Sequence, residues 1–389
     1  MNKKNLHITA LLLMSFSLIG CDLLSNTNPN PSVVNTSNSI KVNYKVSKTI
    51  TVGKTPHGMA QAGGFIYNSN IGENTISVID SKTDTVVKTI TLVDGVSGYM
   101  RVFKDGKNVL VNDTKKGDLL VIDPLQDHKI LQTIHVGSGP DKIRILDDDK
   151  TVLVSLTDEE KIIELTFEAD RNKTPTKKEL KVGKMPEGTE HRFLAVSNEW
   201  VAVPNIDDND VSLVNLSTGV EKRLKDGNEP TVMDINVMNN KAENVVVGNT
   251  ASNTITIFDI NSDSKKTLTD VGLAPTDVVS YPRMNKTFIT MSGSNDVAVI
   301  DYSTKTLLKR ISIGKRPVHI YITNNDKLNN PEIWVGNDDG DSVTVIDPEK
   351  MEVKTTISVG NGHHKMAFTN DKAYVSNIND NTITVINRN

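Results

Sequence analysis

The strongest constraint on the fold is a short motif that recurs along almost the whole chain. A five-residue segment, apolar at alternate positions and closed by Asp, Asn or Thr, occurs eight times with a mean interval of about 44 residues. The eight segments are Ile76–Asp80, Leu119–Asp123, Ile162–Thr166, Val211–Asn215, Ile255–Asp259, Val297–Asp301, Val343–Asp347 and Ile383–Asn387. A period of about 40–45 residues is typical of β-propeller blades, and leucine-rich and ankyrin repeats are shorter.

Each repeat contains four strand-like segments and no helical pattern. In the seventh repeat they are Val318–Ile322, Glu332–Gly336, Ser342–Asp347 and Val353–Val359. All are short, rich in β-branched residues and bounded by Asn, Asp, Gly or Pro, as expected for antiparallel strands. Four-stranded sheets of this kind must stack on neighbours to bury both faces, and closing the stack into a ring leaves few free edges. The sequence therefore predicts an all-β propeller.

The two ends of the repeat region complement each other. The first segment, Lys45–Val52, matches the fourth strand of a repeat, whereas the last repeat supplies only the first three: Lys365–Phe368, Ala373–Asn377 and Thr382–Asn387. We therefore expect the N-terminal strand to complete the C-terminal blade and close the ring. This count gives eight blades over residues 45–389, with seven blades as the alternative.

The turns repeat as well. Anchor residues such as Asp80 and Asp301 open D-x-x-T sequences, in which the carboxylate is expected to accept backbone N–H groups. A Gly-x-x-Pro linker joins most blades, for example Gly53 to Pro56 and Gly314 to Pro317. We expect the glycine to supply a positive φ and the proline to fix φ before the inner strand.

Several of these segments carry a family resemblance. Tyr374-Val375-Ser376-Asn377, the segment 381–386 and the Gly314-x-x-Pro317 linker resemble the YVTN β-propeller repeat family of bacterial and archaeal surface proteins. The resemblance covers residues 45–388 and implies a propeller fold. It implies little about activity, because the matching residues are structural.

The N-terminus is typical of an exported protein. Lys3 and Lys4 precede the apolar stretch Leu6–Ile19, which is shorter than the about 20 residues of a membrane-spanning helix and fits a signal peptide. It ends Leu18-Ile19-Gly20-Cys21, which resembles the bacterial lipobox. That resemblance implies a signal peptide over residues 1–20 and a lipid on Cys21. We expect the polar segment 21–44 to be a flexible tether. The protein is thus expected outside the cytoplasm, with the membrane as a partner.

Composition and missing motifs exclude several functions. The net charge of −4 argues against nucleic acid as a partner, and a single cysteine excludes a disulfide framework or a multi-cysteine metal site. No nucleophile elbow, H-E-x-x-H sequence or phosphate loop occurs, and two tryptophans are too few for the quinoprotein type of propeller. No catalytic residue and no cofactor are assigned.

The candidate site is the channel end where each inner strand begins. Aligning the repeats brings polar and cationic side chains into one funnel. Such a funnel could attract an anion although the protein as a whole carries a net negative charge. The candidate ligand-binding residues are His57, Tyr99, Arg101, Lys142, Arg144, Arg192, Asp277, His319, His364 and Lys365. The sequences His57-Gly58-Met59 and His363 to Met366 suggest copper as an alternative, and Asp-rich hairpins such as 147–149 suggest Ca²⁺, but neither has a full ligand pattern and no metal is assigned.

Two classes of function are compatible with this funnel. We favour a non-enzymatic binding or protein-interaction module, with an unknown protein or small molecule as partner. The alternative is a lactonase- or lyase-like enzyme that uses His57, His319, Asp277, Lys142 and Arg192. A pocket in which such side chains meet a buried carboxylate or imidazole with a perturbed pKa would favour the enzyme. A wide, hydrated channel would favour the binding module.

Overall fold

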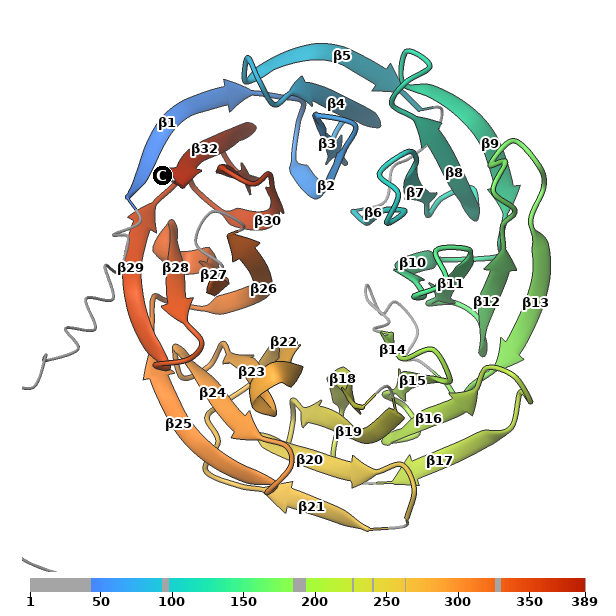
Figure 1. Cartoon of the computed structure of the whole chain (residues 1–389), viewed down its shortest axis with the longest axis vertical. Helices are drawn as coiled ribbons and strands as arrows, with labels where there is room; N and C mark the ends of the chain where they lie inside the picture. Colours follow the sequence, from blue (N-terminus) through green and yellow to red (C-terminus); the bar gives the residue numbers. More distant parts are fainter. Residues whose placement is uncertain are drawn as a thin grey trace, which may run out of the picture. The chain divides into compact units, whose positions relative to one another are not determined.

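The computed structural model describes residues 43–92, 98–184, 194–225, 227–239, 241–262, 264–325 and 330–388. These residues form eight four-stranded antiparallel sheets arranged as blades around a central channel (Figure 1). The predicted all-β propeller with eight blades is therefore confirmed, and the seven-blade alternative is wrong. No helix in the described part of the chain is long and apolar enough to cross a membrane.

Seven blades follow one pattern, in which four consecutive strands run from the channel to the rim. The first four of these are β2–β5 (Pro56–Ala62, Phe65–Asn70, Thr75–Asp80, Thr85–Thr91), β6–β9 (Met100–Val102, Val109–Asp113, Asp118–Asp123, Lys129–His135), β10–β13 (Pro140–Ile145, Thr151–Leu156, Lys161–Thr166, Thr176–Lys181) and β14–β17 (Ala195–Val196, Trp200–Asn205, Asp210–Asn215, Glu221–Lys225).

The next three blades are β18–β21 (Pro230–Met238, Lys241–Asn249, Thr254–Asp259, Lys265–Leu268), β22–β25 (Pro275–Tyr281, Lys286–Met291, Asp296–Asp301, Thr306–Ser312) and β26–β29 (Pro317–Asn325, Asn330–Asn337, Ser342–Asp347, Glu352–Ser358). Two short 3₁₀ turns lie at Pro282–Met284 and Asp338–Gly340. The fourth blade is irregular: its inner strand is only the two residues of β14, whereas the sequence predicted a start near Arg192, which lies outside the described residues.

The eighth blade closes the ring as predicted. Its strand order is β1-β32-β31-β30, so the N-terminal strand β1 (Tyr44–Thr51) lies outside β30 (His363–Phe368), β31 (Lys372–Asn377) and β32 (Thr382–Arg388). Strands β1 and β32 pair antiparallel from Tyr44–Arg388 to Thr51–Thr382 (Figure 1). The pairing places the two ends of the repeat region in one sheet.

A buried polar cluster supports this closure, and we refer to it as the closure cluster: Tyr44, Glu332, Trp334, Lys354 and Arg388. The Glu332 carboxylate is fully buried and accepts hydrogen bonds from the Tyr44 hydroxyl, from Trp334 Nε1 at 3.0 Å and from Lys354 Nζ at 2.8 Å. The buried Arg388 Nη2 lies 3.4 Å from the same carboxylate. The cluster joins β1 and β32 to β27 and β29 of the preceding blade.

The apolar core lies between neighbouring blades. Buried Tyr67 and Val78 of the first blade, for example, pack in one cluster with Val109 and Val111 of the second. Alternate residues of each strand face opposite sides of the sheet, which lets every blade contribute to the two clusters that flank it.

The prediction for the linker glycines is only partly correct, because Gly137, Gly227 and Gly272 have a positive φ and the others do not. Gly53, Gly183, Gly314 and Gly360 do not have the expected positive φ. A Cβ on any of them would lie about 2.5–2.6 Å from atoms of the asparagine that ends the second strand of the adjacent blade. That asparagine, Asn337 beside Gly314, donates Nδ2 hydrogen bonds to Ser342 and Thr344. The positive φ often falls on the residue before the proline, such as Arg316 at 48°. Close backbone approach therefore explains these glycines.

Candidate functional site

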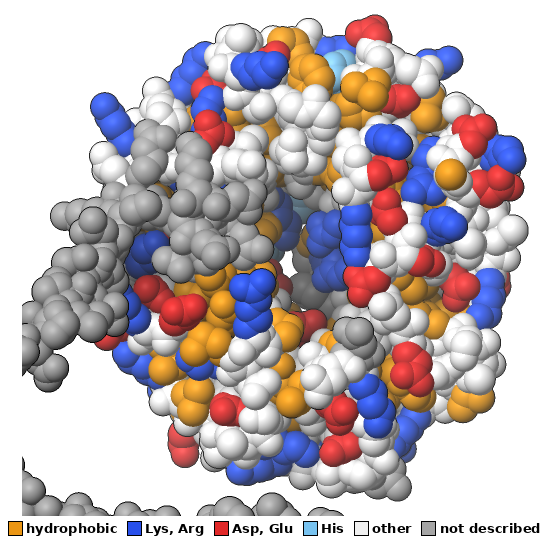
Figure 2. Space-filling view, viewed as in Figure 1, with side chains coloured by type: hydrophobic (Ala, Val, Ile, Leu, Met, Phe, Trp, Pro, Cys, Tyr) orange, Lys and Arg blue, Asp and Glu red, His pale blue; other side chains and the backbone are white. Residues whose placement is uncertain are grey.

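A cavity of about 290 Å³ opens from the central channel at the predicted end of the inner strands. In Figure 2, blue Lys and Arg side chains gather beside the central hollow. Residues of six blades line the cavity: Gly58, Met59, Gly98, Tyr99, Met100, Arg101, Lys142, Arg144, Asp277, Val278, Val279, Ile320, Tyr321, Ile322, Lys365 and Met366. A cavity of this size has room for a small organic molecule rather than for a polymer chain.

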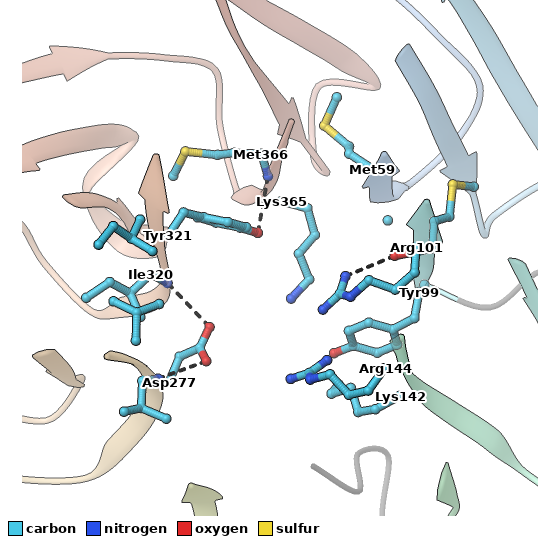
Figure 3. A pocket seen from close by; sticks show the side chains of 16 residues that line it. Met59, Tyr99, Arg101, Lys142, Arg144, Asp277, Ile320, Tyr321, Lys365 and Met366 are labelled. Atoms are coloured by element: carbon cyan, nitrogen blue, oxygen red, sulfur yellow. Dashed lines mark hydrogen bonds between the residues drawn. The ribbon is translucent and has the colours of Figure 1, made fainter. Parts of the chain in front are cut away.

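One wall of the cavity is cationic (Figure 3). Arg101 lies on β6, Lys142 and Arg144 lie two residues apart on β10, and Lys365 lies on β30. Residues two apart on a strand share a face, so the alternation of β10 brings both of its basic side chains toward the channel. In the described part of the chain, no carboxylate lies in ion-pair distance of Arg101, Arg144 or Lys365. Each guanidinium donates to the backbone carbonyl of the preceding residue, at 2.9 Å for Arg101 and 3.2 Å for Arg144.

Burial and repulsion from neighbouring cations lower the pKa values of Lys365 and Arg144. Burial lowers the pKa of Lys365 to about 8, with the charges of Arg101 and Arg144 acting in the same direction and Asp277 opposing them. Burial, followed by the charge of Arg101, lowers the pKa of Arg144 to about 10. The carboxylates of the cavity therefore do not fully compensate the positive charge of this wall. This uncompensated charge favours an anionic ligand.

Lys142 is more enclosed than Lys365. Its Nζ lies 3.2 Å from the centroid of the Tyr99 ring and 3.5 Å from Asp141 Oδ1, and its side chain is only 3% exposed. Burial lowers its pKa well below the usual value, although the charge of Asp141 opposes the shift. Burial also raises the pKa of Tyr99, so that the phenol is neutral at physiological pH.

The opposite wall presents a carboxylate, and an imidazole lies behind it. Asp277, on β22, accepts backbone N–H groups of Val278 at 2.9 Å and Ile320 at 3.3 Å, and its Oδ2 lies 3.5 Å from Nδ1 of His319 on β26. Burial raises the pKa of Asp277 and lowers that of His319. The Lys365 amine lies 3.1 and 3.2 Å from the two ring nitrogens of His319 and links the two walls.

Three histidines form a layer beside the cavity. The ring centroids of His57 and His364 are 3.9 Å apart, and those of His319 and His364 are 4.6 Å apart. Burial, followed by the neighbouring imidazoles His319 and His57, lowers the pKa of His364 well below its usual value. Burial also lowers the pKa of His319, so His319 and His364 are neutral at pH 7. In the described part of the chain no group of three or more His, Cys, Asp or Glu side chains has a geometry that could hold a metal ion.

The structure thus brings most of the predicted funnel residues together. Tyr99, Arg101, Lys142, Arg144, Asp277 and Lys365 line one cavity, and His57, His319 and His364 lie against it. Arg192 and Cys21 lie outside the described residues. Sequence analysis missed Tyr321, whose hydroxyl accepts the Met366 N–H at 3.3 Å. The alignment of the repeats could have identified it. Tyr321 follows His319 by two residues, just as Arg101 follows Tyr99 by two, so the two side chains occupy equivalent positions of their inner strands.

The comparisons with known proteins agree with this fold. A family model described as YNCE-like beta-propeller matches residues 269–388, the last three blades. This match and the eight blades of the structure together assign the protein to a structural class. The chain is a β-propeller repeat protein. A search of curated proteins found no match for this propeller.

Solved structures similar to this propeller belong to proteins with diverse names. They include Sqt1 from Saccharomyces cerevisiae (10% identity, TM-score 0.68, covering 89% of this chain and 98% of that one) and BamB from Moraxella catarrhalis (14%, 0.64, 89% and 100%). A third is dihydro-heme d1 dehydrogenase NirN in complex with DHE (14%, 0.63, 87% and 75%). At these identities the likeness shows the fold alone, and the function must be argued from the site.

Proposed function

We propose that this protein is a lipid-anchored, extracytoplasmic β-propeller that binds a small organic anion in its channel cavity. The observation that carries the proposal is the meeting of Arg101, Lys142, Arg144 and Lys365 on one cavity of about 290 Å³. Burying like charges together raises the free energy of the unliganded site, and an anion that pairs with them recovers part of that cost.

The shape of the site points to a carboxylate as the anionic group. Two guanidiniums on adjacent blades offer planar pairs of N–H donors, which match carboxylate oxygens better than a lysine ammonium does. Met59, Val279, Ile320 and Met366 add an apolar part of the lining, which fits a short carbon skeleton. The site therefore favours a small carboxylic acid over an inorganic ion.

Titration calorimetry on the full-length chain in detergent tests this proposal, with acetate, malonate, pyruvate and phosphate as ligands. We expect a carboxylate to bind and the Arg101→Met or Arg144→Met substitution to weaken it by about tenfold. Arg283→Met is the matched control, because Arg283 is exposed and lies on the turn after β22. Absence of binding by every carboxylate, or equal affinity in Arg144→Met and the wild type, would contradict the proposal.

The anchor is part of the proposal and rests on the sequence Leu18-Ile19-Gly20-Cys21. A lipid on Cys21 would hold the propeller at a membrane, stably so if two acyl chains or more are attached. Labelled palmitate should enter the wild type and not Cys21→Ala, and the variant should leave the membrane fraction or stay unprocessed. A wild type that takes up no palmitate would show that the anchor is wrong.

A second candidate function is hydrolysis of a lactone in the same cavity. It is supported by the contact of His319 Nδ1 with Asp277 Oδ2 at 3.5 Å and by the opposite pKa shifts of the two groups, which burial causes. A neutral imidazole beside a carboxylate can act as a general base. Turnover of a lactone that disappears in His319→Ala would support this candidate, and no turnover across a lactone panel would reject it.

A further inference from the structure

The Lys365 side chain lines the cavity, and among the described residues no carboxylate lies within ion-pair distance of its amine. Its Nζ points into the open space between the two walls (Figure 3) and lies 5.0 Å from the centroid of the Tyr99 ring. Its backbone N–H donates to the buried Ser376 hydroxyl at 2.9 Å, which fixes the position of the strand β30 that carries it. The residue is half-buried and lines the cavity.

The same amine has the properties of a nucleophile. With a pKa of about 8, which burial and the charges of Arg101 and Arg144 produce, roughly one fifth of the lysine is neutral at pH 7.4. Desolvation beside other cations is a known way to activate a lysine for attack on a carbonyl carbon. The neutral His319 ring, 3.1 Å away, can take up or return a proton during that attack.

We propose that Lys365 captures a small 2-oxo acid as an imine, with the carboxylate of the ligand held by Arg101 and Arg144. The inference rests on the proposed anion-binding function and names the class of ligand. A 2-oxo acid places its carbonyl carbon one bond from the carboxylate, so that one molecule can meet the guanidiniums and the amine together. The apolar side chains of Met59 and Met366 leave room for its short carbon tail.

The step balances without an oxidant or a further reactant. The lone pair of the Lys365 amine forms a bond to the carbonyl carbon, and the oxygen takes up a proton. That proton comes from the amine nitrogen, so the resulting carbinolamine carries one N–H and one hydroxyl group. It then loses the hydroxyl group and the remaining N–H proton as water, and a carbon–nitrogen double bond forms. His319 moves the proton from nitrogen toward the departing oxygen. Hydrolysis of the imine reverses every step, so capture is reversible.

Lys142 does not suit this role, although it lines the same cavity. Its Nζ is enclosed between the Tyr99 ring at 3.2 Å and Asp141 Oδ1 at 3.5 Å, and its side chain is 3% exposed. A new bond at that nitrogen would displace the ring or the carboxylate from a packed position. Lys142 is therefore an internal control within the same cavity, because we expect the adduct on Lys365 and not on Lys142.

The test is reductive trapping. The full-length chain in detergent is treated with pyruvate and cyanoborohydride, and peptide mass spectrometry locates the reduced adduct. Acetone is the probe that has a carbonyl but no carboxylate, and lactate is the competitor that has a carboxylate but no oxo group. We expect an adduct on Lys365, about tenfold more with pyruvate than with acetone, and suppressed by lactate.

Two substitutions assign the site. Lys365→Arg keeps a positive charge and has no primary amine, so the adduct should disappear while circular dichroism verifies that the chain is folded. Lys350→Arg, on a side chain that is 72% exposed, should trap pyruvate like the wild type. An adduct on Lys142, or one spread over surface lysines and unchanged in Lys365→Arg, would overturn the inference.

Calorimetry separates this inference from the proposed function. If pyruvate and lactate bind with equal affinity and no adduct forms, covalent capture is wrong and anion binding stands. If no anion binds and no adduct forms, both are wrong.

Discussion

The closure cluster and the channel cavity bury charged groups in opposite ways. In the closure cluster, Glu332 collects donors from Tyr44, Trp334, Lys354 and Arg388, and hydrogen bonds led by Lys354 hold its pKa below the usual value against the effect of burial. In the cavity, cations face one another, and burial lowers the pKa of Lys365 to about 8. The closure cluster therefore compensates its buried charge with its own residues, whereas the channel cavity does not.

This difference separates a structural role from a functional one. A buried carboxylate with several donors is stable as it stands and holds strands together. A buried group of cations with too few carboxylates raises the free energy of the folded protein unless a bound anion pairs with it. Such groups are expected where a ligand binds. Substitutions in the two clusters should therefore change stability in different directions.

The largest effect is expected in the closure cluster. Glu332→Ala leaves the buried Arg388, and the more exposed Lys354, without their carboxylate and should lower the free energy of unfolding by about 3–5 kcal/mol. Chemical denaturation measures this change, with the exposed Glu352→Ala on the same blade as the control. A loss no larger than that of the control would mean that the cluster does not hold the ring closed.

A basic residue of the cavity should behave differently. Arg144→Met removes a charge that burial and Arg101 already disfavour, so the free energy of unfolding should change by less than about 1 kcal/mol or increase. The same denaturation experiment measures it. A destabilisation as large as that of Glu332→Ala would show that Arg144 is a structural residue, and the contrast between the clusters would fail.

The pH dependence of stability tests the same contrast through Lys365. Because the folded pKa of Lys365 is about 8 and the unfolded value is about 10.4, the unfolded chain binds more protons between these values, and stability should rise with pH across this window. Below pH 8 the lysine is protonated in both states and the full cost is present. Lys365→Met should flatten the rise between pH 8 and 10. A slope that is the same in the variant and the wild type would contradict the lowered pKa.

The sequence predicts the fold well because the fold repeats. Eight copies of one strand motif define the blades, and the incomplete last repeat reveals that the N-terminal strand closes the ring. The role of Gly314 could not be predicted in this way, since it depends on how near Asn337 of the adjacent blade lies, a distance that only packing determines.

The site is predicted less completely, for the same physical reason. Register placed Tyr99, Arg101, Lys142, Arg144 and Lys365 at one end of the channel, because equivalent strand positions meet there. Register does not say which neighbours compensate each charge. The contact of Lys365 with His319 and the enclosure of Lys142 by Tyr99 depend on side-chain packing between blades.

The most direct test of the central claim is the titration of Lys365 by nuclear magnetic resonance, with ¹³C in the lysine side chains and Lys365→Arg to assign the signal. The account predicts a pKa of about 8 in the unliganded protein, rising toward the ordinary lysine value when lactate, a carboxylate without an oxo group, is added. A pKa near 10.4 without ligand, unchanged by any carboxylate, would contradict it.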